Sequence, residues 1–189
     1  MDFSPISELE KGSFLIATPE IDGGLFFRSV VLICETSHSG TFGLTINKPM
    51  EVEFPEDVID LNHMSNPNIG IRSGGPVQIN QMMILHDTPQ LDQDTLEICD
   101  QVFLGGELNF LQEQIQNPEG ARLRLCFGYA GWGPGQLEKE IIEDSWIICP
   151  ASDEFIFDLP PEDIWKMLLL SLGGRYAALS MIPEDLSLN

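Results

Sequence analysis

The sequence is poor in basic residues. Its 189 residues include 9 lysines and arginines against 30 aspartates and glutamates, which gives a formal net charge of −21. Both parts of the chain are acidic, since residues 1–100 carry a charge of −12 and residues 101–189 a charge of −9. Binding to nucleic acid or to an anionic membrane surface depends on Lys and Arg that neutralise phosphates. We therefore expect no direct nucleic-acid binding and no membrane binding.

Long hydrophobic runs are also missing. The longest one covers the five residues 30–34, whereas a transmembrane helix needs about 20 apolar residues. The first residues, Met1-Asp2-Phe3-Ser4-Pro5, have neither the basic nor the apolar region of a secretory signal peptide. We expect a cytoplasmic protein.

Closely paired cysteines are absent. The four cysteines Cys34, Cys99, Cys126 and Cys149 lie 65, 27 and 23 residues apart, each in an apolar stretch. This spacing predicts no metal site, and it favours buried, reduced thiols. Cys34 remains a redox candidate, because a cation such as the nearby Arg28 or His38 would lower the pKa of its thiol.

Hydrophobic residues nevertheless make up 43% of the chain, which excludes a disordered acidic protein. A chain of this length can bury a sizeable core without disulfides or metals. No repeat, low-complexity segment or long linker divides it. We therefore predict a single compact domain over residues 1–189.

Apolar runs and turn residues predict an α+β fold with a largely antiparallel sheet and about three helices, mostly in the second half. Three segments have the apolar stripe of a helix, namely 107–116, a segment after Gly135, and 160–173. The expected strands are 13–17, 29–35, 41–47, 69–73, 82–86, a region around 96–104, 122–127 and 145–149. A five-residue loop, 36–40, joins two of them as a hairpin, 51–68 is irregular, and the short run 155–157 is a further candidate strand.

The glycine-rich segment 128–135 lies between a predicted strand and a predicted helix, where phosphate-binding loops occur. Its spacing does not match a nucleotide motif, Pro134 has no N–H group, and Glu138 places a negative charge in the helix's first turn. A tight strand-to-helix connection explains the segment better. No cofactor motif is present elsewhere, and we expect no cofactor.

Two interpretations remain open for the polar and turn-forming residues. His86 beside Asp87 is a conceivable general base, although a hydrogen-bonded structural histidine is the favoured interpretation. An enzyme or small-ligand binder would use a cleft formed by Asn47, the turn 74–77, His86 and the segment 131–138. The candidate ligand-binding residues are Asn47, Gly74, Gly75, Pro76, His86, Trp132, Gln136 and Glu138. Arg28 and Arg72, flanked by apolar residues, are expected to pair with buried carboxylates.

Several blocks together resemble the bacterial AlgH/YqgE family over residues 9–173. The blocks are GSFLIATP at 12–19, FRSVVLICE at 27–35, GLTINKP at 43–49, GGPV at 74–77, LH at 85–86 and GYAGWGPGQLE at 128–138. Thr36 stands where many relatives carry a histidine, and the tail 175–189 differs from the usual family ending.

The resemblance implies a compact α+β fold with coiled, bifurcated sheets in a cytosolic bacterial protein. It names no reaction, although relatives carry the label of transcriptional regulators. Given the charge of −21, we expect any regulation to act through a protein partner and not through DNA, and a basic protein is the candidate that this charge suggests. A non-enzymatic interaction or regulatory protein is thus our leading interpretation, and the cleft-bearing enzyme or ligand binder is the alternative.

Overall fold

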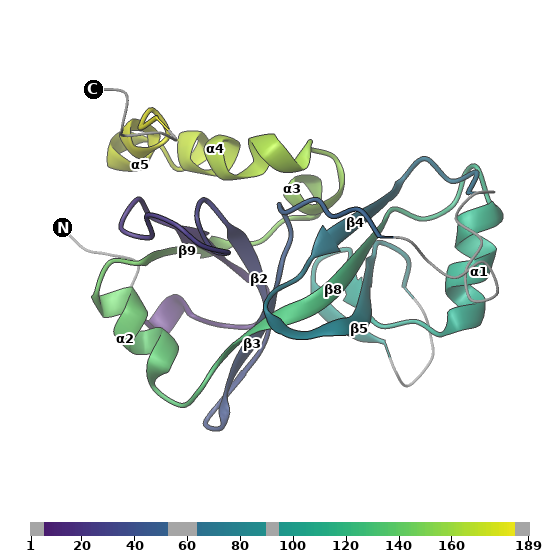
Figure 1. Ribbon diagram of the computed structural model, residues 1–189, viewed down its shortest axis with the longest axis horizontal. Coiled ribbons are helices and arrows are strands. Elements are labelled where there is room, and N and C mark those ends of the chain that lie inside the picture. Colours follow the sequence, from purple (N-terminus) through teal and green to yellow (C-terminus); the bar gives the residue numbers. More distant parts are fainter. Residues whose placement is uncertain (1–5, 53–63, 90–94, 184–189) are drawn as a thin grey trace.

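A single curled sheet organises the protein (Figure 1). The computed structural model describes residues 6–52, 64–89 and 95–183. The strands are β1 Ser13–Ala17, β2 Val30–Ser37, β3 Gly40–Thr45, β4 Ile69–Ser73, β5 Val77–His86, β6 Leu96–Cys99, β7 Val102–Leu104, β8 Leu123–Trp132 and β9 Trp146–Pro150. The helical segments are the 3-10 turn η1 Ile6–Glu8, α1 Leu108–Gln116, α2 Gln136–Ile142, α3 Asp153–Phe157, α4 Pro161–Leu172 and α5 Gly174–Leu179.

Strand β8 holds the two parts of this sheet together. Its first half pairs with β4 and β5, and its second half pairs with β3. The strand order is β6-β7-β5-β8-β3-β2-β1-β9, with β4 added parallel to β8 and the other pairs antiparallel. Gly128 has a positive φ of 70° at the point where the partners change, a conformation that glycine adopts without strain. The predicted α+β class with a largely antiparallel, coiled sheet is confirmed.

Successive side chains of β1 and β2 point to opposite faces of the sheet, so one apolar run contributes to two hydrophobic layers. All five residues of β1 are buried, and so are the first five of β2. Phe14, Ile16 and Leu32 pack into the cluster that contains α3 and α4, whereas Leu15 and Val31 pack into the cluster that contains α2. Successive side chains of a strand point to opposite faces, so a continuous apolar run indicates a sheet covered on both sides.

The three predicted helices are present as α1, α2 and α4, and α4 stops at Gly173 as expected. The expected strand at 155–157 is wrong, because these residues belong to helix α3, which turns Ile156 and Phe157 into the core. A three-residue apolar run fits either element, and here the acidic residues before it favour a helix's first turn.

The expected five-residue hairpin loop is also wrong. Strand β2 continues to Ser37 and β3 begins at Gly40, so only residues 38 and 39 connect them. The Thr36 and Thr41 hydroxyls lie 2.9 Å apart across the hairpin, and this contact extends the pairing beyond the apolar run.

The helices cover the sheet unevenly. In Figure 1, α4 and α5 run above β9 and β2, α2 flanks the same end, and α1 lies at the far end beyond β5. The hairpin of β2 and β3 projects from the lower edge of the view, away from α4 and α5. No helix in the described ranges has both the length and the apolar character needed to span a membrane.

Candidate functional site

The segment after β8 is held by one carboxylate that the sequence did not single out. The indole N–H groups of Trp132 and Trp146 both donate to Oε2 of Glu140, each at 2.9 Å. The Gln136 amide donates to Oε1 of Glu140 at 3.0 Å, and its own oxygen accepts from the Gly133 N–H at 3.1 Å. Two of the candidate ligand-binding residues, Trp132 and Gln136, thus fix the connection between β8 and α2. The spacing of Gln136 and Glu140, four residues apart on one helix, was the available sequence signal.

Glu138 lies in the first turn of α2 and is half-buried. A carboxylate at this place interacts favourably with the helix dipole, and it would repel an anionic ligand. Gly135 before it has a positive φ of 75°. The segment 131–138 therefore has the properties of a strand-to-helix connection.

The turn of Gly74 and Gly75 packs directly against the backbone of β8. The Gly74 N–H donates to the Phe127 carbonyl at 2.7 Å, and the Gly74 carbonyl accepts from the Thr45 N–H at 2.8 Å. A Cβ atom on either glycine would come within 2.2 Å of backbone atoms of residues 128 or 129. The glycines allow two backbones to approach closely, and Pro76 beyond them is exposed.

Asn47 is buried and bonded on both sides of its amide. Its Oδ1 accepts from the Val30 N–H at 2.8 Å, and its Nδ2 donates to the Arg28 carbonyl at 2.9 Å. Arg28 has a positive φ of 51°, so the amide supports the backbone where β2 begins. The side chain replaces a pair of ladder hydrogen bonds, which is a structural role.

His86 is fully buried at the end of β5. Its ring stacks against Phe103 at 5.8 Å and contacts Phe110 at 4.9 Å between centroids. The neighbouring Asp87 carboxylate is bonded to the guanidinium of Arg122 at 2.7 Å. A general base must reach its substrate, and a ring enclosed between aromatic side chains has no such access.

Burial determines the state of the cysteines. Cys34 and Cys126 are fully buried, Cys149 is 6% exposed, and Cys99 is half-buried. Burial raises the pKa of Cys99 and Cys149 to about 11 and that of Cys126 to about 12, and it raises the pKa of Cys34 still further. A redox-responsive thiol needs exposure and a lowered pKa, so the structure gives the redox interpretation of Cys34 no support.

The buried guanidinium of Arg72, for which we expected a carboxylate partner, is bonded to backbone carbonyl oxygens in the part of the chain that the structure describes. The Nε of Arg72 donates to the Ile46 carbonyl at 3.0 Å, and Arg124 donates to the Ile156 and Phe157 carbonyls at 3.0 and 2.5 Å. Burial, followed by the charge of Arg72, lowers the pKa of Arg124 to about 10.

Arg28 lies 4.7 Å over the ring of Trp165 and donates to the Ile182 carbonyl. Three aspartates surround the more exposed Arg122, namely Asp87, Asp153 and Asp158.

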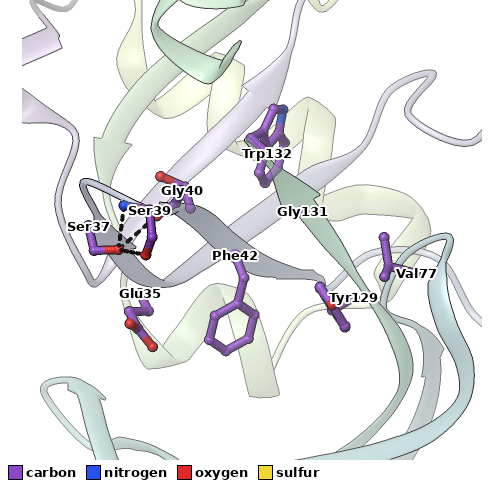
Figure 2. A pocket seen from close by; sticks show the side chains of 10 residues that line it. Glu35, Ser37, Ser39, Gly40, Phe42, Val77, Tyr129, Gly131 and Trp132 are labelled. Carbon is purple, nitrogen blue, oxygen red and sulfur yellow. Dashed lines mark hydrogen bonds between the residues drawn. The ribbon is translucent and has the colours of Figure 1, made fainter. Parts of the chain in front are cut away.

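The structure gathers only part of the expected cleft. A hollow of about 350 Å³ opens on the sheet where the hairpin of β2 and β3 meets β8, and we call it the Phe42 hollow (Figure 2). It is lined by Glu35, Ser37, Ser39, Gly40, Thr41, Phe42, Val77, Tyr129, Gly131 and Trp132. Of the expected cleft, Val77, Gly131 and Trp132 lie there, whereas Asn47, His86, Gln136 and Glu138 do not line it.

The Phe42 hollow combines aromatic and polar groups. The rings of Phe42 and Tyr129 meet edge to face with centroids 5.8 Å apart. The hydroxyls of Ser37 and Ser39 lie 2.8 Å apart at the hairpin tip, beside the Glu35 carboxylate. Glu35, Phe42 and Tyr129 were not predicted as a group, because Tyr129 joins the other two only through the pairing of β3 with β8, which lie far apart in the sequence. Among the described residues, no group of His, Cys, Asp or Glu is arranged to hold a metal ion.

Comparisons with known proteins identify relatives over nearly the whole chain. A family model described as AlgH-like matches residues 14–177. A UPF0301 protein of Chlamydia abortus is 49% identical over 185 residues, which cover 98% of each chain. A UPF0301 protein of Agrobacterium fabrum is 35% identical and covers 92% of this chain and 94% of its own.

Two solved structures share the fold. The solution structure of the AlgH protein from Pseudomonas aeruginosa has a TM-score of 0.68 and 29% identity, with 97% of this chain and 98% of that chain covered. A crystal structure of a Corynebacterium diphtheriae protein has a TM-score of 0.76 and 22% identity, with 96% and 95% covered, and shows the fold alone.

Proposed function

The chain belongs to the AlgH-like family, and on that premise we propose that it is a cytoplasmic, non-enzymatic interaction protein that regulates by binding a basic protein partner. The observation that carries the proposal is that most of the nine basic side chains are already engaged by contacts within the chain. Eight of them already have a contact within the chain, namely Lys11, Arg28, Lys48, Arg72, Arg122, Arg124, Lys139 and Arg175. Two of these, Arg72 and Arg124, are buried.

The acidic side chains are distributed differently. Most of those in the described ranges are exposed, namely Glu8, Glu10, Glu20, Asp22, Glu35, Glu51, Glu97, Asp100, Glu107, Glu113, Glu119, Glu143, Glu154, Asp158, Glu162 and Asp163. A surface of this kind repels phosphate backbones and attracts basic proteins. It favours regulation through a protein over regulation through DNA.

The positions of the candidate cleft residues favour this function over the alternative enzyme or ligand binder. Asn47 and His86 are buried, and Gly74 and Gly75 pack on β8. Trp132 and Gln136 both donate hydrogen bonds to the Glu140 carboxylate. The side chains expected to bind a substrate are thus engaged in holding the fold.

Affinity capture from the native cell tests the proposal. The tagged full-length chain should retain a basic protein at about 50 mM salt and lose most of it at about 200 mM, because interactions between exposed charges are screened. The captured protein should bind again when both are purified. Recovery of no salt-sensitive partner would count against the proposal. Tight binding of the purified chain to duplex DNA would refute the expectation that the protein does not bind DNA directly.

A further inference from the structure

The Phe42 hollow lies on one face of the β2–β3–β8 ribbon, and strand register determines which side chains share that face. Glu35 pairs with Phe42 across the hairpin, and Phe42 pairs with Gly131 across the next ladder. Tyr129 is two residues before Gly131 on β8 and pairs with Val77 of β5. Directly paired residues, and residues two apart on a strand, point to the same side of a sheet. One acidic side chain, two rings and one aliphatic side chain therefore meet here.

Gly131 keeps this face open. It is exposed, and a Cβ atom there would lie 3.2 Å from Cε2 of Tyr129, so a side chain would extend over the ring and into the hollow. The rings of Phe42 and Tyr129 are half-buried, and their surfaces remain partly available. Figure 2 shows the Glu35 carboxylate and the Phe42 ring side by side on the hairpin.

This combination of groups suits an organic cation. Aromatic faces attract ammonium and guanidinium groups within about 6 Å of a ring centroid. A carboxylate accepts charge-assisted hydrogen bonds from the same cation, and hydroxyls such as those of Ser37 and Ser39 supply further acceptors. The planar guanidinium of arginine can stack on a ring while it donates two parallel bonds to a carboxylate, which the ammonium of lysine cannot do.

We propose that the Phe42 hollow binds one arginine side chain of the basic protein partner. The inference rests on the proposed function, and it assigns that function a recognition site. Charge complementarity supports a protein as the occupant, because the hollow carries the exposed Glu35 on a chain with a net charge of −21. A volume of about 350 Å³ is at the lower end of ligand sites, which fits one side chain and not a folded element.

A short peptide with a single arginine flanked by glycines and serines tests the site directly. Titration of the full-length, isotope-labelled chain should shift the NMR amide signals of Phe42, Val77 and Gly131 as one group. A lysine peptide should shift them less, and a citrulline peptide, which has the same shape without charge, should leave them in place. Equal shifts with citrulline, or no shift at about 10 mM arginine peptide, would overturn the inference.

Variants show whether the hollow itself is responsible. Glu35→Gln should weaken arginine-peptide binding about fivefold, since it removes one partly exposed ion pair. Gly131→Val, which fills the hollow at a strand position that accepts a β-branched residue, should abolish the shifts. Glu119→Gln is the matched control, because it removes the same charge from an exposed position outside the hollow. Equal weakening by Glu119→Gln would mean that general attraction, and not the hollow, binds the peptide.

The captured partner separates this inference from the proposed function. If Glu35→Gln and Gly131→Val bind that partner as tightly as the unmodified chain, the hollow is not the site, although the chain remains an interaction protein. If no basic partner is captured but the arginine peptide binds at the hollow, the proposed function fails. Unchanged near-ultraviolet circular dichroism of each variant shows that the fold is retained, and Tyr129→Leu provides a second way to remove a ring if Gly131→Val does not fold.

Discussion

The Glu140 carboxylate joins side chains from β8, α2 and β9. A helix pattern in the sequence does not reveal the two partners that lie on strands. In the sequence, Glu138 and Glu140 are two acids of the same expected helix, the one after Gly135. The structure separates them, because Glu140 accepts both indole N–H groups and the Gln136 amide, while Glu138 lies at the start of α2. Trp132 and Trp146 are 6% and 4% exposed, so water cannot replace the lost acceptor easily.

Removing the Glu140 carboxylate should therefore destabilise the protein strongly. We expect Glu140→Ala to lower the free energy of unfolding by about 2–3 kcal/mol, because it leaves two buried indole donors without their acceptor. Glu140→Gln keeps one acceptor oxygen and should cost about half as much. Urea unfolding followed by tryptophan fluorescence measures both. Glu143→Ala breaks only an exposed pair with Lys139 and should change the stability by less than about 0.5 kcal/mol, so an equal effect of the two alanine variants would contradict the assignment.

At the scale of elements, the sequence predicts local structure better than pairing. Helices α1, α2 and α4 were predicted from their apolar stripes, and Gly135 and Gly173 marked the start of α2 and the end of α4. These signals involve only residues that are close in the sequence. Strand β8 was expected to end at 127, yet it continues to Trp132 through Gly128. That extension depends on β3 and Val77, which lie far away in the sequence. Local propensity cannot supply such partners.

The contact between the 74–75 turn and β8 leads to a prediction about Gly74. A Cβ at this position would lie 2.2 Å from the Gly128 carbonyl oxygen, which belongs to a backbone that cannot move aside without loss of strand pairing. We expect Gly74→Ala to lower the free energy of unfolding by about 2 kcal/mol or more, as overpacking does.

Gly23→Ala is the control for this substitution, since nothing lies within 4 Å of a Cβ there, and its effect should stay within about 0.5 kcal/mol. Urea midpoints measure both variants. Amide exchange of the Gly74 N–H, which donates to the Phe127 carbonyl, reports on the turn itself. Similar midpoints for the two variants would show that the backbones do not approach as closely as described.

At the scale of the whole molecule, the composition predicted general properties of the protein, whereas the sequence did not predict which residues form the site. Apolar content excludes a disordered chain, and the net charge argues against nucleic-acid binding. The candidate residues Asn47 and His86 lie at strand ends, where a polar side chain can face either solvent or core, and tertiary packing buries both. Conversely, the Phe42 hollow depends on the register of three strands, so no local motif marks it.

The net charge of −21 also determines how stability should respond to salt. Like charges repel one another in the compact state, and eight of the nine basic groups already have contacts within the chain, so few remain to offset the exposed acids. We expect the free energy of unfolding in urea to rise by roughly 1–2 kcal/mol between about 20 and 500 mM NaCl, because the screening length falls below the spacing of surface charges. A variant with Glu20, Glu113 and Glu119 changed to Gln and Asp22 to Asn removes four exposed negative charges and should respond less. Stability that falls with salt would mean instead that ion pairs such as those of Arg122 outweigh the repulsion.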